Sequence, residues 1–181
     1  MHRVLSLALL FAAACGNASE ETPRPKDSAP KSPATVEMIG VKASDVHSTI
    51  DSADAKVIVL SFWATSCVPC VKELPHFVAL GREWADRGVK VVFVSADFPE
   101  DREKAGALLA KLGVVGPSWI KSAQQKDQAF LDGFTPWDGT LPATFVYDEN
   151  RHVAVFHPGP MTPAELETAV RGALSGTARS D

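Results

Sequence analysis

The stretch SFWATSCVPCVKELP, from Ser61 to Pro75, decides the fold. It begins inside the apolar, β-branched run KVIVLSFW at residues 56–63, which is typical of a strand buried on both faces. After two cysteines separated by two residues, apolar side chains return at helical spacing, which predicts a helix over residues 67–86 that ends before Gly88. The cysteines therefore lie where a buried strand passes into a helix, at the edge of an α/β sheet that usually carries chemistry.

Strand and helix patterns alternate along the rest of the chain. The other predicted strands cover residues 36–41, 89–97 and 118–121 and a hairpin at 143–157. The other predicted helices cover residues 44–53, 99–113, 122–133 and 162–176, with Ser44 and Thr162 as expected N-caps of the first and the last. This order predicts an α/β layer fold with helices on both faces of a mixed central sheet.

Composition limits the domain count and the partners. A chain of 181 residues that is 45% hydrophobic can bury one substantial core. Its 18 basic and 22 acidic residues give a net charge of −4, without a basic block of the kind that follows phosphates. We therefore expect one globular domain and no nucleic-acid partner.

The N-terminus has the layout of an export signal. One Arg precedes an apolar stretch that runs only to Ala14, which is too short for the ~20 residues of a membrane helix. We expect a signal peptide over residues 1–14. The three alanines before Cys15 resemble the bacterial lipoprotein box, which implies a lipidated Cys15; the alternative is an ordinary signal peptide that leaves Cys15 as a free thiol.

A tether is predicted between this signal and the globular domain. Residues 16–36 are rich in Pro, Ser, Ala and charge and contain no aromatic residue, Leu or Ile. Such a segment cannot bury enough surface to offset its ordering entropy. We expect residues 15–36 to tether a domain over residues 37–181 to a membrane, through acyl chains on Cys15 alone, on the periplasmic side.

Three roles compete for Cys67 and Cys70. A structural disulfide that closes so short a loop removes little entropy from the unfolded chain. A structural zinc site needs four ligands, and no second cysteine pair is present. A redox dithiol fits better, because the start of a helix favours a thiolate. By position Cys67 is then the nucleophile and Cys70 the resolving thiol, with Pro69 tolerated in the first turn.

These motifs resemble a known group of proteins. FWATSCVPC with KELP, followed by GTLPATFVYD, resembles the thioredoxin superfamily, within it the TlpA/ResA-like, membrane-tethered periplasmic thiol:disulfide oxidoreductases. The resemblance covers about residues 37–177 and implies a thioredoxin-like three-layer sandwich with this group's insertion at about 98–134. It also implies that Pro75 kinks the helix and that Pro142 is a cis-proline beside the dithiol, offering backbone groups to an extended substrate strand.

The resemblance implies a substrate-binding surface around the dithiol. Its expected residues are Trp63, which would also shield the dithiol, Val68, Pro69, Leu141 and Pro142. Trp137 either faces the substrate or covers a loop. Two positions depart from the family pattern: Ser61 replaces the buried Asp of thioredoxin, and Ser66 replaces a frequent Trp.

Glu73 is the candidate base. It matches an acidic residue that the TlpA/ResA-like group places three residues after the second cysteine, and this spacing puts it on the same helical face as Cys70. Resolution requires Cys70 to lose a proton while buried, and apolar neighbours would raise the pKa of Glu73 toward the working range. The alternative is an ordinary surface glutamate beside Lys72.

We predict a disulfide reductase without a separate cofactor or metal, in which Cys67 and Cys70 carry the electrons. The resemblance implies exported thiol or disulfide proteins such as apocytochrome c as substrates, and a membrane reductant donor upstream. The alternative is a copper chaperone that holds Cu(I) between the two thiolates and delivers it to a membrane oxidase. No Met or His stands at an obvious spacing for a third copper ligand.

Overall fold

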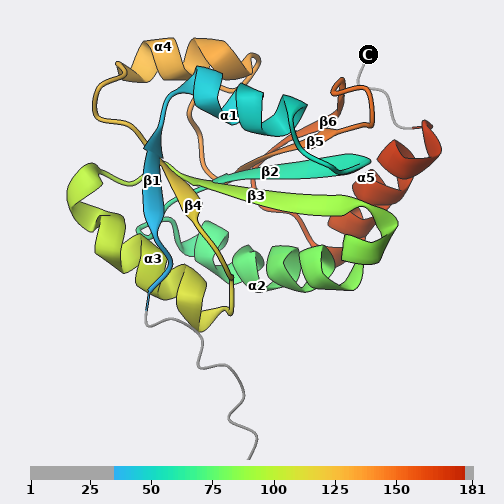
Figure 1. Cartoon of the computed structure of the whole chain (residues 1–181), viewed down its shortest axis with the longest axis horizontal. Helices are drawn as coiled ribbons and strands as arrows, with labels where there is room; N and C mark the ends of the chain where they lie inside the picture. Colours follow the sequence, from blue (N-terminus) through green and yellow to red (C-terminus); the bar gives the residue numbers. More distant parts are fainter. Residues whose placement is uncertain (1–34, 178–181) are drawn as a thin grey trace, which may run out of the picture. The chain divides into compact units, whose positions relative to one another are not determined.

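One mixed, six-stranded sheet organises the domain. The computed structural model describes residues 35–177. The strands are β1 (Met38–Val41), β2 (Val57–Trp63), β3 (Val89–Ser95), β4 (Ser118–Lys121), β5 (Ala143–Tyr147) and β6 (Val153–Pro158). Their order in the sheet is β1-β4-β3-β2-β5-β6. β2 pairs in parallel with β3 and antiparallel with β5, so the two halves of the sheet meet on it (Figure 1).

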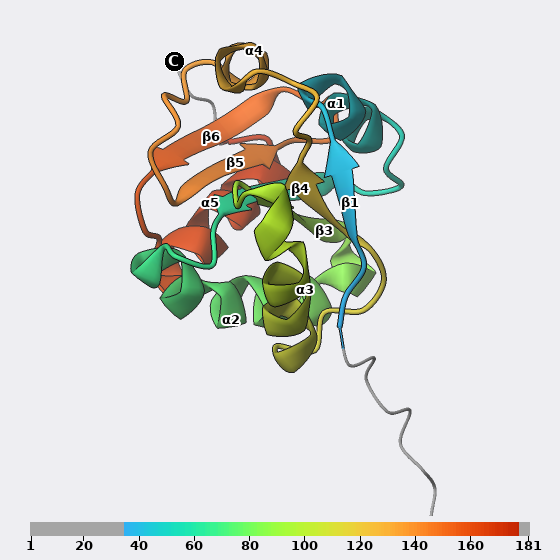
Figure 2. The ribbon, with the colours of Figure 1, turned by 90° about the vertical axis from the view of Figure 1, so that its left-hand side faces the viewer.

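Five helices cover the two faces of this sheet. They are α1 (Ala43–Asp51), α2 (Val68–Glu83), α3 (Arg102–Lys111), α4 (Asp127–Leu131) and α5 (Pro163–Ser175). Short 3₁₀ turns lie at Ala85–Arg87, Pro99–Asp101 and Asp132–Phe134. In Figure 2, α1 and α4 lie on one side of the sheet and α2, α3 and α5 on the other. The predicted three-layer α/β fold of the thioredoxin type is confirmed.

The central strand β2 belongs to both hydrophobic cores. All seven of its residues are buried. Val57, Val59 and Trp63 face the layer of α2, α3 and α5, whereas Ile58, Leu60 and Phe62 face the layer of α1 and α4. The alternation follows from the period-two geometry of a strand. It explains why β2 is apolar at every position except Ser61.

Several predicted boundaries needed correction. Helix α1 begins at Ala43 with Lys42 as its N-cap, because the Asp45 carboxylate accepts a hydrogen bond from the Lys42 N–H at 2.8 Å; Ser44 lies inside the helix. Helix α2 ends at Glu83, and a 3₁₀ turn continues to Gly88, whose φ is +81°. The predicted strand at residues 118–121 and the Thr162 N-cap of α5 are confirmed.

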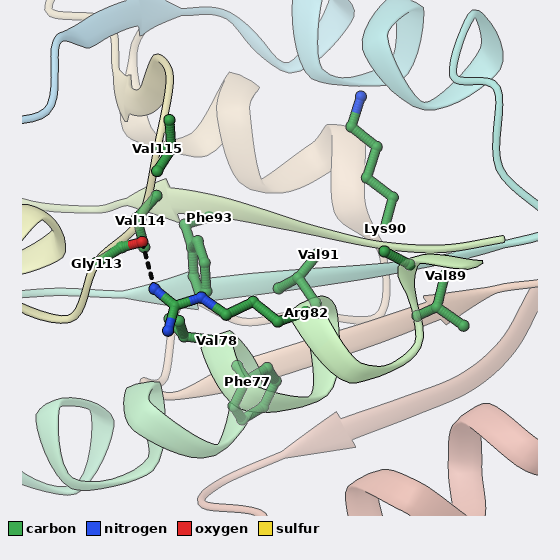
Figure 3. A pocket seen from close by; sticks show the side chains of 12 residues that line it. Phe77, Val78, Arg82, Val89, Lys90, Val91, Phe93, Gly113, Val114 and Val115 are labelled. Atoms are coloured by element: carbon green, nitrogen blue, oxygen red, sulfur yellow. Dashed lines mark hydrogen bonds between the residues drawn. The ribbon is translucent and has the colours of Figure 1, made fainter. Parts of the chain in front are cut away.

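A side-chain contact joins α2 to the end of α3. The Arg82 guanidinium donates hydrogen bonds to the carbonyl oxygens of Leu112 and Gly113. Figure 3 shows the bond to Gly113. Beside it lies a surface pocket lined by apolar residues of α2, of β3 and of the segment after α3, among them Phe77, Val91 and Val114. Because this pocket lies against the second half of α2, it is separate from the cysteines at the start of that helix.

The folded domain begins before Glu37. Val36, which we expected in the tether, is only 3% exposed, and its N–H donates to the Gly106 carbonyl at 3.0 Å. A Cβ atom at Gly106 would lie 2.2 Å from the carbonyl oxygen of Val36. Glycine is therefore required at this position of α3 by the close approach of the first ordered segment.

This contact reverses the usual effect of an alanine in a helix. Gly→Ala inside a helix normally stabilises by about 1 kcal/mol, but Gly106→Ala should destabilise by roughly 1–3 kcal/mol because backbone must move. Urea unfolding of the oxidised protein measures the difference. Lys104→Ala, on the exposed face of α3, is the matched control and should be nearly neutral. An increase in stability for Gly106→Ala would contradict the close contact.

Candidate active site

Cys67 and Cys70 form a disulfide at the start of α2. Their sulfur atoms are 1.99 Å apart and their Cα atoms 5.2 Å apart. Cys67 is the N-cap of α2 and precedes the first helical residue, Val68, whereas we predicted Cys67 inside the first turn. Its Sγ accepts a hydrogen bond from the Cys70 N–H at 3.3 Å. No acidic residue stands in the first turn of α2. The positive end of the helix dipole therefore favours a thiolate on Cys67 after reduction.

The two sulfurs differ in access. Cys67 is partly exposed, whereas Cys70 is completely buried. Val68 is 64% exposed and Pro69 is exposed as well, so the CVPC turn presents an apolar surface around Cys67. Of the two sulfurs, only that of Cys67 is open to an incoming group, and that of Cys70 lies inside the protein. This arrangement fits the predicted roles of nucleophile and resolving thiol.

A buried carboxylate, which we did not predict, holds the loop before Cys67. The Asp97 carboxylate accepts hydrogen bonds from the Thr65 N–H at 2.9 and 3.0 Å, from the Thr65 hydroxyl at 2.8 Å and from the Ser95 hydroxyl at 2.7 Å. Nearby, the Ala96 N–H donates to the Trp63 carbonyl at 2.7 Å. The ends of β2 and β3 are thus joined at the dithiol. The signal in the sequence was an Asp at the end of a buried strand, two residues after Ser95.

The Leu141–Pro142 peptide bond is cis, as predicted. Ala143 pairs with Phe62 in the sheet, which puts Leu141 and Pro142 beside the end of β2 that leads to Cys67. Proline has no N–H to offer a substrate, and the Pro142 carbonyl accepts a hydrogen bond from the Gly159 N–H at 2.8 Å. The predicted contact of Pro142 with a substrate stays a prediction. Leu141 precedes β5 and remains the candidate for such contacts.

Both tryptophans near the site are structural. Trp63 is completely buried in the cluster that contains Cys70, so it covers the dithiol from within and its predicted contact with substrate was wrong. Trp137 stacks on Phe62 with ring centroids 4.1 Å apart, and its Nε1–H donates to the Thr140 carbonyl at 2.8 Å. Its 6% exposure and its bond to Thr140 favour the alternative that it covers a loop.

Glu73 is a buried carboxyl group. It is 4% exposed, so the surface-glutamate interpretation was wrong. Its Oε2 accepts a hydrogen bond from the Met161 N–H at 2.8 Å, whereas Oε1 has no partner in the described part of the chain. Burial raises the pKa of Glu73 from 4.5 to about 7, and the Met161 hydrogen bond opposes part of this rise. The group therefore titrates in the range that a base needs at neutral pH.

A surface pocket connects Glu73 to solvent beside the dithiol. Its volume is about 360 Å³, and its lining includes Pro69, Lys72, Glu73, His76 and Met161. Pro69 belongs to the CVPC turn, so the pocket lies next to the cysteines. A proton taken up by Glu73 has a short route to bulk water here.

Two further observations concern metals and membranes. Between residues 35 and 177, no three or more His, Cys, Asp or Glu side chains are grouped so that they would hold a metal ion. No helix in the same range is both long and apolar enough to cross a membrane. The predicted signal peptide, Cys15 and nearly all of the predicted tether lie outside the described residues.

Comparison with known proteins defines the class. Residues 25–156 match the model of the AhpC/TSA family, and the chain belongs to this family. Thioredoxin-like protein YneN of Bacillus subtilis is 30% identical over 135 residues, which cover 68% of this chain and 69% of that protein. Thiol-disulfide oxidoreductase ResA of Halalkalibacterium halodurans is 30% identical over 114 residues, which cover 63% of this chain and 60% of the relative. The chain thus matches only part of the length of this ResA.

Solved structures support the same fold. The thiol:disulfide interchange protein of Chlorobium tepidum has a TM-score of 0.56 at 23% identity, with 81% of this chain and 99% of that chain covered. A thioredoxin-like protein in its oxidised form has a TM-score of 0.57 at 23% identity. The similarity extends over most of the described domain, including both sides of the dithiol.

The raised pKa of Glu73 predicts a pH-dependent stability. The pKa of Glu73 is about 7 in the folded protein, against an ordinary value of 4.5 for the unfolded chain. Below about pH 4.5 the carboxyl is protonated in both states and its ionisation does not affect the free energy of unfolding. As pH rises from there through 7, burial of this group lowers the free energy of unfolding. Glu73→Gln should therefore gain stability relative to wild type across this window, on the order of 2 kcal/mol. Urea unfolding of both oxidised proteins from acid to neutral pH measures it.

A control separates this effect from the loss of any carboxylate. Glu83→Gln changes an exposed glutamate of the same helix and should give a stability difference that hardly varies with pH. If the Glu73→Gln difference were equally flat, Glu73 would not be the group that ionises against burial.

Proposed function

We propose that this protein is a thiol-disulfide oxidoreductase that reduces disulfides in exported proteins. The observation that carries the proposal is the Cys67–Cys70 pair, with one accessible sulfur at a helix start, one buried sulfur, and the buried carboxyl of Glu73 on the same side of the helix. The names of the ResA and YneN relatives support the same chemistry.

The first step forms a mixed disulfide. The Cys67 thiolate attacks one sulfur of the substrate disulfide, a bond forms between the two sulfurs, and the substrate disulfide breaks. The second substrate sulfur leaves as a thiolate and takes a proton from water. Leu141 is suited to hold the substrate backbone for two reasons. It lies beside the end of β2, and it is not paired with a neighbouring strand of the sheet. The exposed Val68 and Pro69 are suited to pack against substrate side chains.

The second step resolves the mixed disulfide between Cys67 and the substrate. Cys70 gives its thiol proton to the Glu73 carboxylate, directly or through one water, and the resulting thiolate attacks the Cys67 sulfur. The bond between Cys67 and the substrate breaks, and the substrate leaves as a thiolate that is then protonated. Two electrons have passed to the substrate, and the Cys67–Cys70 disulfide is restored to the form seen in the structure. An upstream membrane reductant donor returns the two electrons.

The predicted location agrees with this chemistry. Disulfides persist outside the cytoplasm, where a reductase finds substrates. The export-type N-terminus and the alanines before Cys15 support an acyl anchor on the periplasmic side. Apocytochrome c, whose haem attachment requires free thiols, is one substrate of the required kind.

Trapping tests the function directly. With Cys70→Ala, the mixed disulfide on Cys67 should accumulate, because the resolving thiol is missing; Cys67→Ala should trap nothing. The variants are expressed in the native compartment, quenched in acid and analysed by mass spectrometry for the attached protein. Wild-type protein should also reduce insulin disulfides without metal. Tight stoichiometric copper binding with no insulin reduction would overturn the proposal in favour of the copper chaperone.

The rate of resolution tests the role of Glu73 as the base. Glu73→Gln should leave the first attack by Cys67 nearly unchanged but slow resolution by roughly 100-fold, so that mixed disulfide accumulates in stopped-flow reactions. The deficit should be largest at and above pH 7, where wild-type Glu73 is ionised. Resolution at the wild-type rate across the titration range would make Glu73 a bystander.

Cys15→Ser tests the anchor. If Cys15 carries two or more acyl chains, which hold a protein stably where one does not, the variant should be released from membranes or remain as an uncleaved precursor. Membrane fractionation and the mass of the N-terminal peptide measure this. Unchanged partitioning without lipid mass on the wild-type peptide would contradict lipidation.

A further inference from the structure

Two hydroxyl groups are buried without partners at the centre of the sheet. Ser61 on β2 and Thr144 on β5 are both completely buried. Neither Ser61 Oγ nor Thr144 Oγ1 has a hydrogen-bond partner among residues 35–177. Buried polar side chains in proteins nearly always have a partner, either a protein group or an ordered water. These hydroxyls therefore require an explanation.

The two side chains are neighbours on one face of the sheet. Ser61 and Thr144 stand directly opposite each other in the antiparallel pairing of β2 with β5. Directly paired residues have Cβ atoms only about 4.5–5.5 Å apart. Alternation along the strands shows which face they occupy: Val59 and Trp63 flank Ser61 on its face of β2, and Val146 follows Thr144 on the same face of β5.

This face is the one that lies under the dithiol. Val59, Trp63 and Val146 belong to the same buried cluster as Cys70. Two more buried polar atoms without partners come from this layer, Trp63 Nε1 and Glu73 Oε1. The described residues thus have four such side-chain atoms: Ser61, Thr144 and Trp63 carry three of them on this face of the sheet, and Glu73 carries the fourth on α2.

We propose that Ser61 and Thr144 hold one ordered water molecule beneath Cys70, and that this water donates a hydrogen bond to the Cys70 sulfur when it becomes a thiolate. A buried water typically makes about three hydrogen bonds. The two hydroxyls supply two partners, each able to donate and accept, and the third comes from the donor Trp63 Nε1 or from Cys70. The water site is inferred only from the two buried, unpartnered hydroxyls and their pairing in the sheet. Its effect on Cys70 rests in addition on the proposed function.

The water would matter in the resolving step. Desolvation raises the pKa of a buried thiol, because the thiolate is stabilised less than in water. A hydrogen bond donated to the thiolate offsets part of that cost. Ser61 and Thr144 are then positioning residues, which act on Cys70 through the water and exchange no proton themselves. Glu73 remains the proton acceptor.

High-resolution crystal structures of the oxidised wild type and of the Ser61→Ala/Thr144→Val double variant test the site. Wild type should show a water within hydrogen-bond distance of both hydroxyls, and the variant should lack it. Direct hydrogen bonding between the two hydroxyls, or an empty space, would overturn the proposal. Thr144→Val keeps the side-chain shape, so the comparison isolates the hydroxyl.

Urea unfolding gives an independent measure. If the water bridges both hydroxyls, each single variant should lower the unfolding midpoint, and the double variant should lower it by less than the sum, since the same water is lost. If the hydroxyls are dry and unpaired, their removal should raise the midpoint. The second outcome overturns the proposal whether or not the protein reduces disulfides.

Kinetics test the role of the water. Ser61→Ala and Thr144→Val should each slow resolution of a model mixed disulfide by about tenfold, equivalent to one hydrogen bond to a charged group, and should shift its pH profile upward. Ser122→Ala, which removes a buried hydroxyl that bonds to Gln124, is the control and should resolve at the wild-type rate. Wild-type resolution in the two site variants would overturn this role. An inactive wild type would instead contradict the proposed function and leave the crystallographic and unfolding tests in force.

Discussion

The carboxylate of Asp97 joins the ends of the two central parallel strands, and the geometry of the dithiol depends on this connection. β2 ends at Trp63 and α2 begins at Val68, so the chain has only four residues in which to turn from the sheet into the helix. Thr65, in the middle of that turn, gives both its N–H and its hydroxyl to Asp97. The turn is therefore fixed from the neighbouring strand, and Cys67 is held as the N-cap of α2.

Packing on both sides of β2 supplies the rigidity behind this turn. Alternate side chains of the strand enter two separate cores, one with α2, α3 and α5 and one with α1 and α4. Phe62 stacks on Trp137 in one layer, and Trp63 packs with Cys70 in the other. The strand that leads to the reactive sulfur is consequently held by contacts on both faces. A site built on such a strand keeps its geometry better than a site on a free loop.

The fold and the Cys67–Cys70 pair could be predicted from the sequence because both depend on local patterns. The largely apolar run of β2, CxxC at a helix start and the Leu141–Pro142 pair are visible in consecutive residues. Contacts between residues far apart in the sequence could not be predicted in this way. Three such contacts, between positions 17 to 88 residues apart, are Asp97 with Thr65, Met161 with Glu73, and Gly159 with Pro142. The same limit explains why Trp63 was assigned to substrate, since burial depends on what packs against a side chain.

Under the proposed function, the difference in exposure between the two sulfurs also governs how the protein exchanges electrons with a donor and a substrate. In the oxidised form only Cys67 presents a sulfur that an external thiolate can reach, since Cys70 is completely buried. The donor that refills the dithiol must attack the same atom that later attacks the substrate. For the proposed reductase, donor and substrate therefore compete for one sulfur and bind in turn, so we expect a ping-pong order without a complex of all three proteins.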